Sequence, residues 1–297
     1  MSIKIAFSTI SCPSYTAAQQ ATAARDYAYD GVELYALEGE RLTVPLLDNR
    51  LDELRNVFRT TGVPVVAINS WGKFSMPDAE ERARMEASVL RCLELAAALD
   101  CGQVKTFGGE LPAGQAREEV FDYMAEHLGR IARRGEELGI TLLLETHDGF
   151  AASSHVAALL ERVPSSRFAA LWDVHHPHRM GETPEQVDAA IGARVRHVHV
   201  KDGRRTGQPP SDHWDFVLLG DGELAPDVKE ALGLLARRDF HGYVAVDWEK
   251  MWYPEIAGPE IALPHFAHVL RDYVRVAEHA TEAHGNDPSV ASSDHHA

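Results

Sequence analysis

ITLLLETHD (residues 140–148) is a short apolar run that ends in acidic and imidazole side chains, and the chain repeats this pattern three more times. The later runs are RFAALWDVHH (167–176), VRHVHVKD (195–202) and GYVAVDWEK (242–250). At or near their carboxyl ends the four runs carry, in order, Glu145, Asp173, His199, and the pair Asp247 and Glu249. A (β/α)₈ barrel builds a metal site at its upper face from such donors at successive strand ends.

Strand and helix signals alternate along the rest of the chain, as in α/β folds. We predict strands at 3–9, 31–35, 64–69, 102–107, 140–145, 168–173, 195–200 and 242–248. We predict helices at 14–29, 46–61, 77–99, 114–138, 152–162, 183–191, 224–238 and 259–282. A dinucleotide-binding sheet would need a GxGxxG motif after its first strand, and STISCPSY (8–15) lacks one. We therefore predict a single (β/α)₈ TIM barrel.

One barrel domain is expected over residues 1–282, followed by a polar tail over 283–297 that we expect to be disordered. The long connections 201–223 and 249–258 follow the last two strands on the face where barrel chemistry occurs, so they are candidate lids. Gly62, Gly102 and Gly139 stand where helices end just before strands, which predicts a left-handed cap at each.

Composition narrows the class of protein. The net charge of −16 argues against a grip on nucleic-acid phosphates, which needs clustered Lys and Arg. Three cysteines without CxxC spacing favour reduced thiols, and hence a cytoplasmic enzyme, over a disulfide framework. No apolar run reaches the roughly 18 residues of a membrane span, and MSIKIAFSTIS (1–11) is typical of a strand rather than a secretory signal. We expect neither nucleic acid nor membrane as a partner; the oligomeric state, a homo-oligomer included, stays open.

Side-chain alternation predicts that the strand-end donors face the barrel interior. Every second residue of a strand shares a face, so His199 points inward while Val198 and Val200 face the outer helices. The same rule turns Glu145 and Asp247 inward. A single strand-end acid is usually a helix cap or a salt-bridge partner, but four donors in succession favour a metal site. Oxygen and imidazole donors suit one divalent ion; we expect Mn²⁺, with Mg²⁺, Co²⁺ or Zn²⁺ as alternatives.

The chain also resembles a known family. KTFGG (105–109), LLLETHDGF (142–150), LWDVHHP (171–177), HVHVKD (197–202) and GYVAVDWEKMWYPEI (242–256) are similar to segments of the xylose-isomerase-like superfamily, in particular its sugar phosphate isomerase/epimerase branch. That branch includes ketose 3-epimerases, hydroxypyruvate isomerase and inosose dehydratase. The resemblance runs from residue 3 to about 275 and implies a TIM barrel that acts on a small carbohydrate.

The resemblance implies roles for particular residues. The family's metal ligands match Glu145, Asp173, His199 and an acid of the eighth strand. His176 matches a residue that contacts substrate hydroxyls. The eighth-strand acid of the family is usually Glu, and this chain has Asp247 at the matching position, which reaches one methylene less far. We expect Asp247 to be the ligand, with Glu249, two residues on and on the same face, as the alternative.

The implied chemistry is α-proton transfer on a keto-sugar or sugar derivative. A divalent ion polarises the carbonyl and stabilises an enediolate, while Glu145 on one side and Asp247 or Glu249 on the other remove and return the proton. Return to the opposite face gives epimerisation, and return to the neighbouring carbon gives isomerisation. We therefore predict a metal-dependent sugar isomerase or epimerase. Elimination needs the same residues, so the alternative is a lyase such as inosose dehydratase or an enzyme that eliminates from a 3-keto-glycoside.

Further residues near strand ends are candidates for substrate binding. We expect substrate contacts from His147, Lys201, Trp71 and Lys105. The ordinary alternatives are ion pairs or core packing, and Lys105 in particular could pair inside the barrel with Glu33 or Glu145. An abasic-site DNA endonuclease of the same fold would need extra histidines after strands two and three, and ELY (33–35) and NSW (69–71) contain none. A metal-free binding module would leave all four donors idle, which makes it the weaker interpretation.

Overall fold

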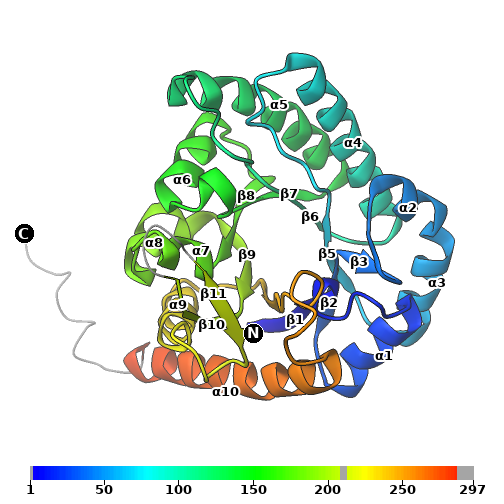
Figure 1. Ribbon diagram of the computed structural model, residues 1–297, viewed down its shortest axis with the longest axis vertical. Helices are drawn as coiled ribbons and strands as arrows, with labels where there is room; N and C mark the ends of the chain where they lie inside the picture. The colour runs from blue at the N-terminus through cyan, green and yellow to red at the C-terminus, as the bar shows by residue number, and fades with distance from the viewer. Residues whose placement is uncertain (1–2, 208–212, 286–297) are drawn as a thin grey trace, which may run out of the picture.

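The computed structural model describes residues 3–207 and 213–285, and its central feature is a barrel of parallel strands (Figure 1). The barrel strands are β1 Lys4–Ser8, β2 Gly31–Leu34, β5 Val65–Asn69, β6 Gln103–Thr106, β7 Thr141–Glu145, β8 Phe168–Asp173, β9 Val195–Val200 and β12 Tyr243–Val246. They close in the order β1-β12-β9-β8-β7-β6-β5-β2. All eight predicted strands are present, and the predicted TIM barrel is confirmed.

Helices surround the barrel (Figure 1). They are α1 Ala17–Asp26, α2 Val44–Asn49, α3 Leu51–Thr61, α4 Ala79–Ala98, α5 Arg117–Leu138, α6 Ser153–Arg162, α7 His175–Arg179, α8 Pro184–Ile191, α9 Ala225–Arg237 and α10 Pro259–Gly285. The predicted helix 46–61 is split at Arg50, and α7 was not predicted. The last helix continues past 282, and residues 286–297 of the predicted tail lie outside the described residues. No helix within the described ranges is long and apolar enough to cross a membrane.

Residues with a left-handed backbone conformation (positive φ) lie at the ends of several helices. We predicted this conformation for three glycines, and two of them adopt it. Gly62 and Gly139 have φ angles of 72° and 74°. The prediction was wrong for Gly102. Before β6 the left-handed residue is Asp100, with φ of 55°, because α4 already ends at Ala98 and its C-terminal cap is Leu99.

Two hairpins that the sequence did not predict lie outside the barrel. One joins β3 (Ala36–Leu37) to β4 (Glu40–Arg41), and the other joins β10 (Asp202–Arg205) to β11 (Trp214–Val217). The second falls within the connection 201–223, where the buried Asp202 carboxylate accepts four backbone hydrogen bonds at 2.8–3.1 Å. The donors are the N–H groups of Gly203, Gly220, Gly222 and Leu224. Such charge-assisted bonds fix both ends of this connection beside the barrel mouth.

The barrel interior is apolar just beneath the predicted site. Leu143, Leu171 and Ala245 are buried, and each comes two residues before a predicted site residue on the same strand face. The parallel register sets Asp173 beside His199, and His199 beside Ala245. Apolar side chains of β7, β8 and β12 therefore lie beneath the site, and polar side chains gather above them.

Candidate metal centre and active site

The four predicted metal ligands lie together at the carboxyl ends of neighbouring strands. One donor atom from each of Glu145, Asp173, His199 and Asp247 lies within 4.8 Å of the others, and all four residues are buried. They come from β7, β8, β9 and the residue after β12, which are consecutive around the barrel. We call this group the four-donor centre. Glu249, the alternative ligand, does not belong to it.

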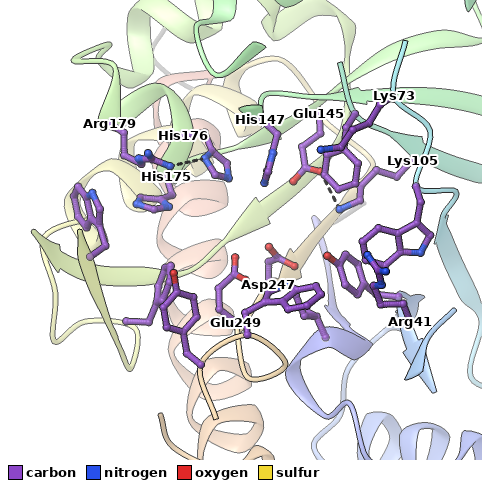
Figure 2. A pocket seen from close by; sticks show the side chains of 18 of the residues that line it. Arg41, Lys73, Lys105, Glu145, His147, His175, His176, Arg179, Asp247 and Glu249 are labelled. Atoms are coloured by element: carbon purple, nitrogen blue, oxygen red, sulfur yellow. Dashed lines mark hydrogen bonds and ion pairs between the residues drawn. The ribbon is translucent and has the colours of Figure 1, made fainter. Parts of the chain in front are cut away.

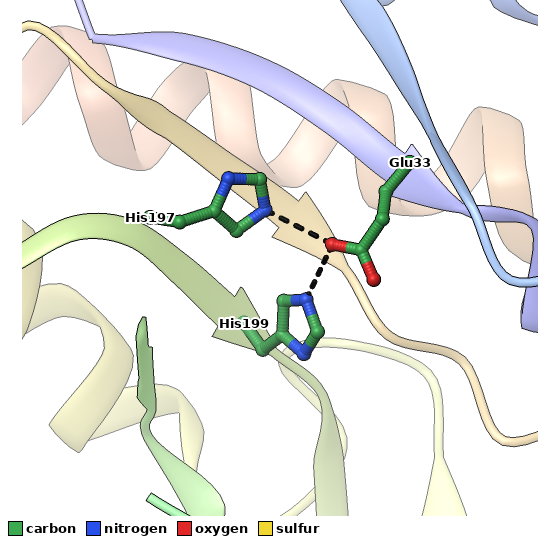
Figure 3. A group of neighbouring side chains, drawn as sticks. All are labelled: Glu33, His197 and His199. Carbon is green, nitrogen blue, oxygen red and sulfur yellow. Dashed lines mark hydrogen bonds and ion pairs between the residues drawn. The ribbon is translucent and has the colours of Figure 1, made fainter. Parts of the chain in front are cut away.

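The His199 ring is oriented for metal binding. Its Nδ1 lies 3.2 Å from Glu145 Oε1 and 3.7 Å from Asp247 Oδ2. Its Nε2 lies 2.7 Å from Glu33 Oε2 of β2, and His197 Nε2 lies 3.1 Å from the same oxygen, as Figure 3 shows. A carboxylate on the far nitrogen fixes the ring of a histidine ligand and strengthens the donor on the near nitrogen.

A buried ammonium group joins three acids of the site. Lys201 Nζ lies 2.8 Å from each of three carboxylate oxygens, which belong to Asp173, Asp247 and Glu249. The lysine is 1% exposed and does not line the cavity described below. In this structure its ammonium is therefore directed to the three acids, and its contact with a substrate stays a prediction.

The second buried lysine lies on the opposite side of the centre. Lys105 Nζ is 2.9 Å from Glu145 Oε2 and 3.8 Å from Glu33 Oε1. The ion pair that we considered for Lys105 is present, and the residue also lines the cavity, where its contact with a substrate stays a prediction. Burial alone would raise the pKa of Glu145, but the Lys105 and His199 charges hold that pKa well below its usual range.

The site has an excess of negative charge that a divalent cation could neutralise. Five carboxylates (Glu33, Glu145, Asp173, Asp247 and Glu249) surround two ammonium groups (Lys105 and Lys201), and with His199 counted as neutral, five minus two leaves three uncompensated negative charges. Burial raises the pKa of Asp173, and the Glu145 and Asp247 carboxylates add to this rise against Lys201. Burial opposes protonation of His199, but Glu33 and Asp247 outweigh it and raise its pKa to about 10. Without a metal, Asp173 and His199 therefore tend to bind protons, which a divalent ion would replace.

Two buried donor atoms support the same conclusion. Within the described part of the chain, His199 Nδ1 and Asp247 Oδ1 make no hydrogen bond. Buried polar atoms without such a partner are rare in folded proteins, and imidazole nitrogen and carboxylate oxygen are both common ligands of divalent ions. The residues of the four-donor centre thus fit a divalent metal ion.

A cavity of about 440 Å³ opens above the centre (Figure 2). Its volume is typical of small-molecule sites, which span about 300–1,000 Å³. Glu145, Asp247 and Glu249 reach it. One wall is aromatic, with the Trp71 ring 4.6 Å from Tyr35 and 6.4 Å from Phe107. The cavity therefore offers carboxylates on its floor and flat apolar rings at its side.

Four of the five predicted substrate-binding residues line this cavity: His176, His147, Trp71 and Lys105. The rings of His147 and His176 lie 4.3 Å apart. Burial lowers the pKa of His176 well below its usual value, and the His147 charge adds to this effect. Burial also acts to lower the pKa of His147, but the hydrogen bond to Asp148 at 2.8 Å outweighs it and raises that pKa.

Several cavity residues were not predicted from the sequence. Arg41, Lys73, His175 and Arg179 all line the cavity. Arg41 belongs to the unpredicted hairpin β3–β4, while His175 and Arg179 belong to the unpredicted helix α7. In the sequence these residues are marked only by lying in connections that follow the carboxyl ends of barrel strands. Many exposed residues share that position.

The chain belongs to the family of xylose isomerase-like TIM barrels. The model of this family matches residues 21–271, which is most of the barrel. The family agrees with the resemblance drawn from the strand-end motifs.

Relatives of the chain are enzymes of isomerase and dehydratase type. Over 207 residues the chain is 26% identical to the 2-oxo-tetronate isomerase of Pectobacterium atrosepticum. This alignment covers 66% of this chain and 77% of that protein. Over 155 residues the chain is 24% identical to inosose dehydratase 2 of Bacillus cereus. This alignment covers 48% of this chain and 51% of that protein, so the chain spans about half the length of this relative. The solved structure of the IolI protein with a zinc atom has a TM-score of 0.78 at 18% identity, covering 93% of this chain and 99% of that one. At this identity the structural match shows the shared fold.

Proposed function

We propose that the protein is a divalent-metal-dependent isomerase or epimerase of a keto-sugar or sugar derivative. The observation that carries the proposal is the four-donor centre at the floor of a sugar-sized cavity. Glu145, Asp173, His199 and Asp247 would hold the ion, for which we propose Mn²⁺. When bound, the ion would supply electrophilic polarisation of substrate oxygens. The similarity to a 2-oxo-tetronate isomerase supports the reaction class.

Proton transfer falls to carboxylates on two sides of the cavity. Glu145 ends β7, whereas Asp247 and Glu249 follow β12, three positions away around the barrel. Figure 2 shows Glu145 on one side of the cavity and the other two acids opposite. One carboxylate takes the proton α to the substrate carbonyl and leaves an enediolate. The acid opposite returns a proton, to the other face of the same carbon or to the neighbouring carbon.

The remaining lining residues orient the substrate. His176 and His147 present ring nitrogens that can hydrogen-bond sugar hydroxyls. Trp71 can pack against the apolar face of a sugar ring. A substrate held between them has its reacting carbon over the carboxylates, which is the positioning that proton transfer requires.

Deuterium exchange tests the proposal directly. The purified protein, supplied with Mn²⁺, is incubated in D₂O with a panel of keto-sugars and followed by NMR. We expect α-proton exchange with at least one sugar and a rate at least about 100-fold lower for Glu145→Gln, since a positioned base contributes about 10²–10⁴-fold. Glu161→Gln, an exposed change on α6, is the matched control. Exchange at the wild-type rate in Glu145→Gln would exclude the two-carboxylate mechanism.

A lyase reaction is the second candidate, favoured by the similarity to inosose dehydratases. The same base would remove the α-proton, and a β-hydroxyl would then leave with a proton as water. The NMR experiment separates the two reactions, because elimination removes the signals of one hydroxyl-bearing carbon from the product, whereas isomerisation and epimerisation conserve the number of such carbons.

A further inference from the structure

A guanidinium lies on the aromatic wall of the cavity. Arg41, the last residue of β4, places its guanidinium 5.0 Å from the centre of the Trp71 ring and lines the cavity. Within residues 3–207 and 213–285, the Arg41 side chain forms no ion pair or hydrogen bond. Its planar N–H groups therefore remain available to a bound ligand.

The ring beneath Arg41 is held rigidly. Trp71 has a φ of 61°, in the left-handed region that non-glycine residues rarely adopt. Its indole N–H donates to the Leu42 carbonyl at 3.1 Å, and its backbone N–H donates to Asn69 Oδ1 at 3.1 Å. Strained backbone of this kind concentrates at ligand sites, where the surrounding structure maintains it. The indole bond also ties Trp71 to the hairpin that carries Arg41, so ring and guanidinium are oriented together.

A second cation lies on the same wall. Lys73 Nζ is 5.7 Å from the Phe107 ring centre and 2.7 Å from Asp148 Oδ2. The other Asp148 oxygen lies 2.8 Å from His147 Nδ1, so this carboxylate contacts both Lys73 and His147. Figure 2 shows Arg41, Lys73 and Lys105 on one side of the cavity.

The three acids that line the cavity have the two buried lysines as their nearest cations. Glu145 is paired with Lys105, while Asp247 and Glu249 are paired with Lys201. A ligand group near Trp71 would therefore meet the Arg41 guanidinium, although the four-donor centre has excess negative charge and the chain as a whole carries −16. Local charge of one sign inside a cleft attracts ligands of the opposite sign.

We propose that the substrate is a sugar acid whose carboxylate binds Arg41 over the Trp71 ring, while its carbonyl and hydroxyl oxygens lie at the four-donor centre. This inference rests on the proposed function and specifies its substrate class. A guanidinium holds a carboxylate through two parallel N–H donors, and stacking on an aromatic ring preserves that fork. A phosphate carries more charge and accepts more bonds than one guanidinium supplies, and Lys73 is already shared with Asp148. The carboxylate is therefore the anion that fits.

Binding of unreactive ligands tests the inference without turnover. Isothermal titration of the Mg²⁺-loaded protein is made with D-gluconate, D-glucitol and D-glucitol 6-phosphate, which share one carbon skeleton. We expect gluconate to bind about 10- to 100-fold more tightly than glucitol, as one charge-assisted bidentate pair provides. Arg41→Gln should abolish most of this preference and leave glucitol binding unchanged. Arg59→Gln, an exposed change on α3, is the matched control.

Each outcome bears on the assignment. Equal affinities for gluconate and glucitol, no gluconate binding at millimolar concentrations, or an unchanged preference in Arg41→Gln would overturn it. Tighter binding of the 6-phosphate than of gluconate would replace the carboxylate by a phosphate. Wild-type affinity for gluconate in Arg41→Lys would exclude the bidentate contact.

Experiments can contradict the carboxylate subsite and the proposed reaction independently of each other. If the protein prefers gluconate through Arg41 but exchanges the α-proton of no keto-sugar acid, the carboxylate subsite is supported and the proposed reaction is excluded. If the protein exchanges the α-proton of neutral keto-sugars at a rate that Arg41→Gln does not change, the reaction is supported and the carboxylate subsite is excluded.

Discussion

Lys201 is the internal counter-ion of the four-donor centre, and its removal should destabilise the metal-free protein strongly. Lys201→Met keeps the length and apolar stem of the side chain but deletes an ammonium that lies 2.8 Å from three carboxylates. Removal of one partner from a buried ion pair costs about 3–5 kcal/mol, because a buried charge is left uncompensated. The Glu249 side chain is 15% exposed and partly solvated, so we expect a loss of about 3–4 kcal/mol. With an unfolding entropy of about 0.6 kcal/mol/K for a chain of 297 residues, this corresponds to a fall in Tm of roughly 5–6 °C.

A divalent ion should reverse much of this loss. The ion would neutralise Asp173 and Asp247, two of the acids that Lys201 contacts. Any ligand that binds the folded state alone raises stability according to its concentration and affinity. We therefore expect saturating Mn²⁺ to raise the Tm of Lys201→Met more than that of the wild type, and to shrink the difference between the two proteins by half or more.

Thermal unfolding followed by circular dichroism measures both effects. Protein dialysed against EDTA is melted alone and then with increasing Mn²⁺. Lys229→Met is the matched control, because Lys229 is exposed on α9 and its ammonium lies 4.6 Å from the Tyr273 ring, away from the site. A metal-free Lys201→Met protein that melts within about 1 °C of the wild type would refute the counter-ion role. So would an equal rise in Tm for both proteins on addition of Mn²⁺.

Further substitutions separate the roles of the neighbouring residues. Glu33→Gln should weaken Mn²⁺ binding about 10- to 100-fold in calorimetric titrations, since Glu33 orients the His199 ring; unchanged affinity would show that the ring is held by other contacts. His176→Ala should raise KM or lower kcat while elemental analysis finds the metal retained, because the ring lines the cavity but lies outside the four-donor centre; metal loss would make it a ligand. Asp247→Asn should lose metal and Glu249→Gln should lose less, and the reverse order in elemental analysis would reassign the eighth-strand ligand.

Patterns along the chain were sufficient to predict the fold and the location of the site. Apolar runs of strand length, separated by helical segments, predicted all eight barrel strands. Because side chains alternate along a strand, a donor at a strand end must face the barrel axis if its neighbours face the helices. For this reason the sequence could predict that Glu145, Asp173, His199 and Asp247 converge, and the structure brings them within 4.8 Å of one another.

Contacts between elements distant in the sequence could not be derived in this way. Arg41 reaches Trp71 through a hairpin of two-residue strands, which are too short to produce a periodic pattern. Lys201 lies on the inward face, as alternation predicts. Whether its ammonium reaches a substrate or the acids depends on distances between strands that only the closed barrel sets. The sequence by itself thus determined which residues face the barrel interior, because strand alternation is local. Which charges pair there, and which guanidinium remains available to a ligand, was decided by the tertiary structure, because electrostatic contacts depend on packing between residues far apart in the chain.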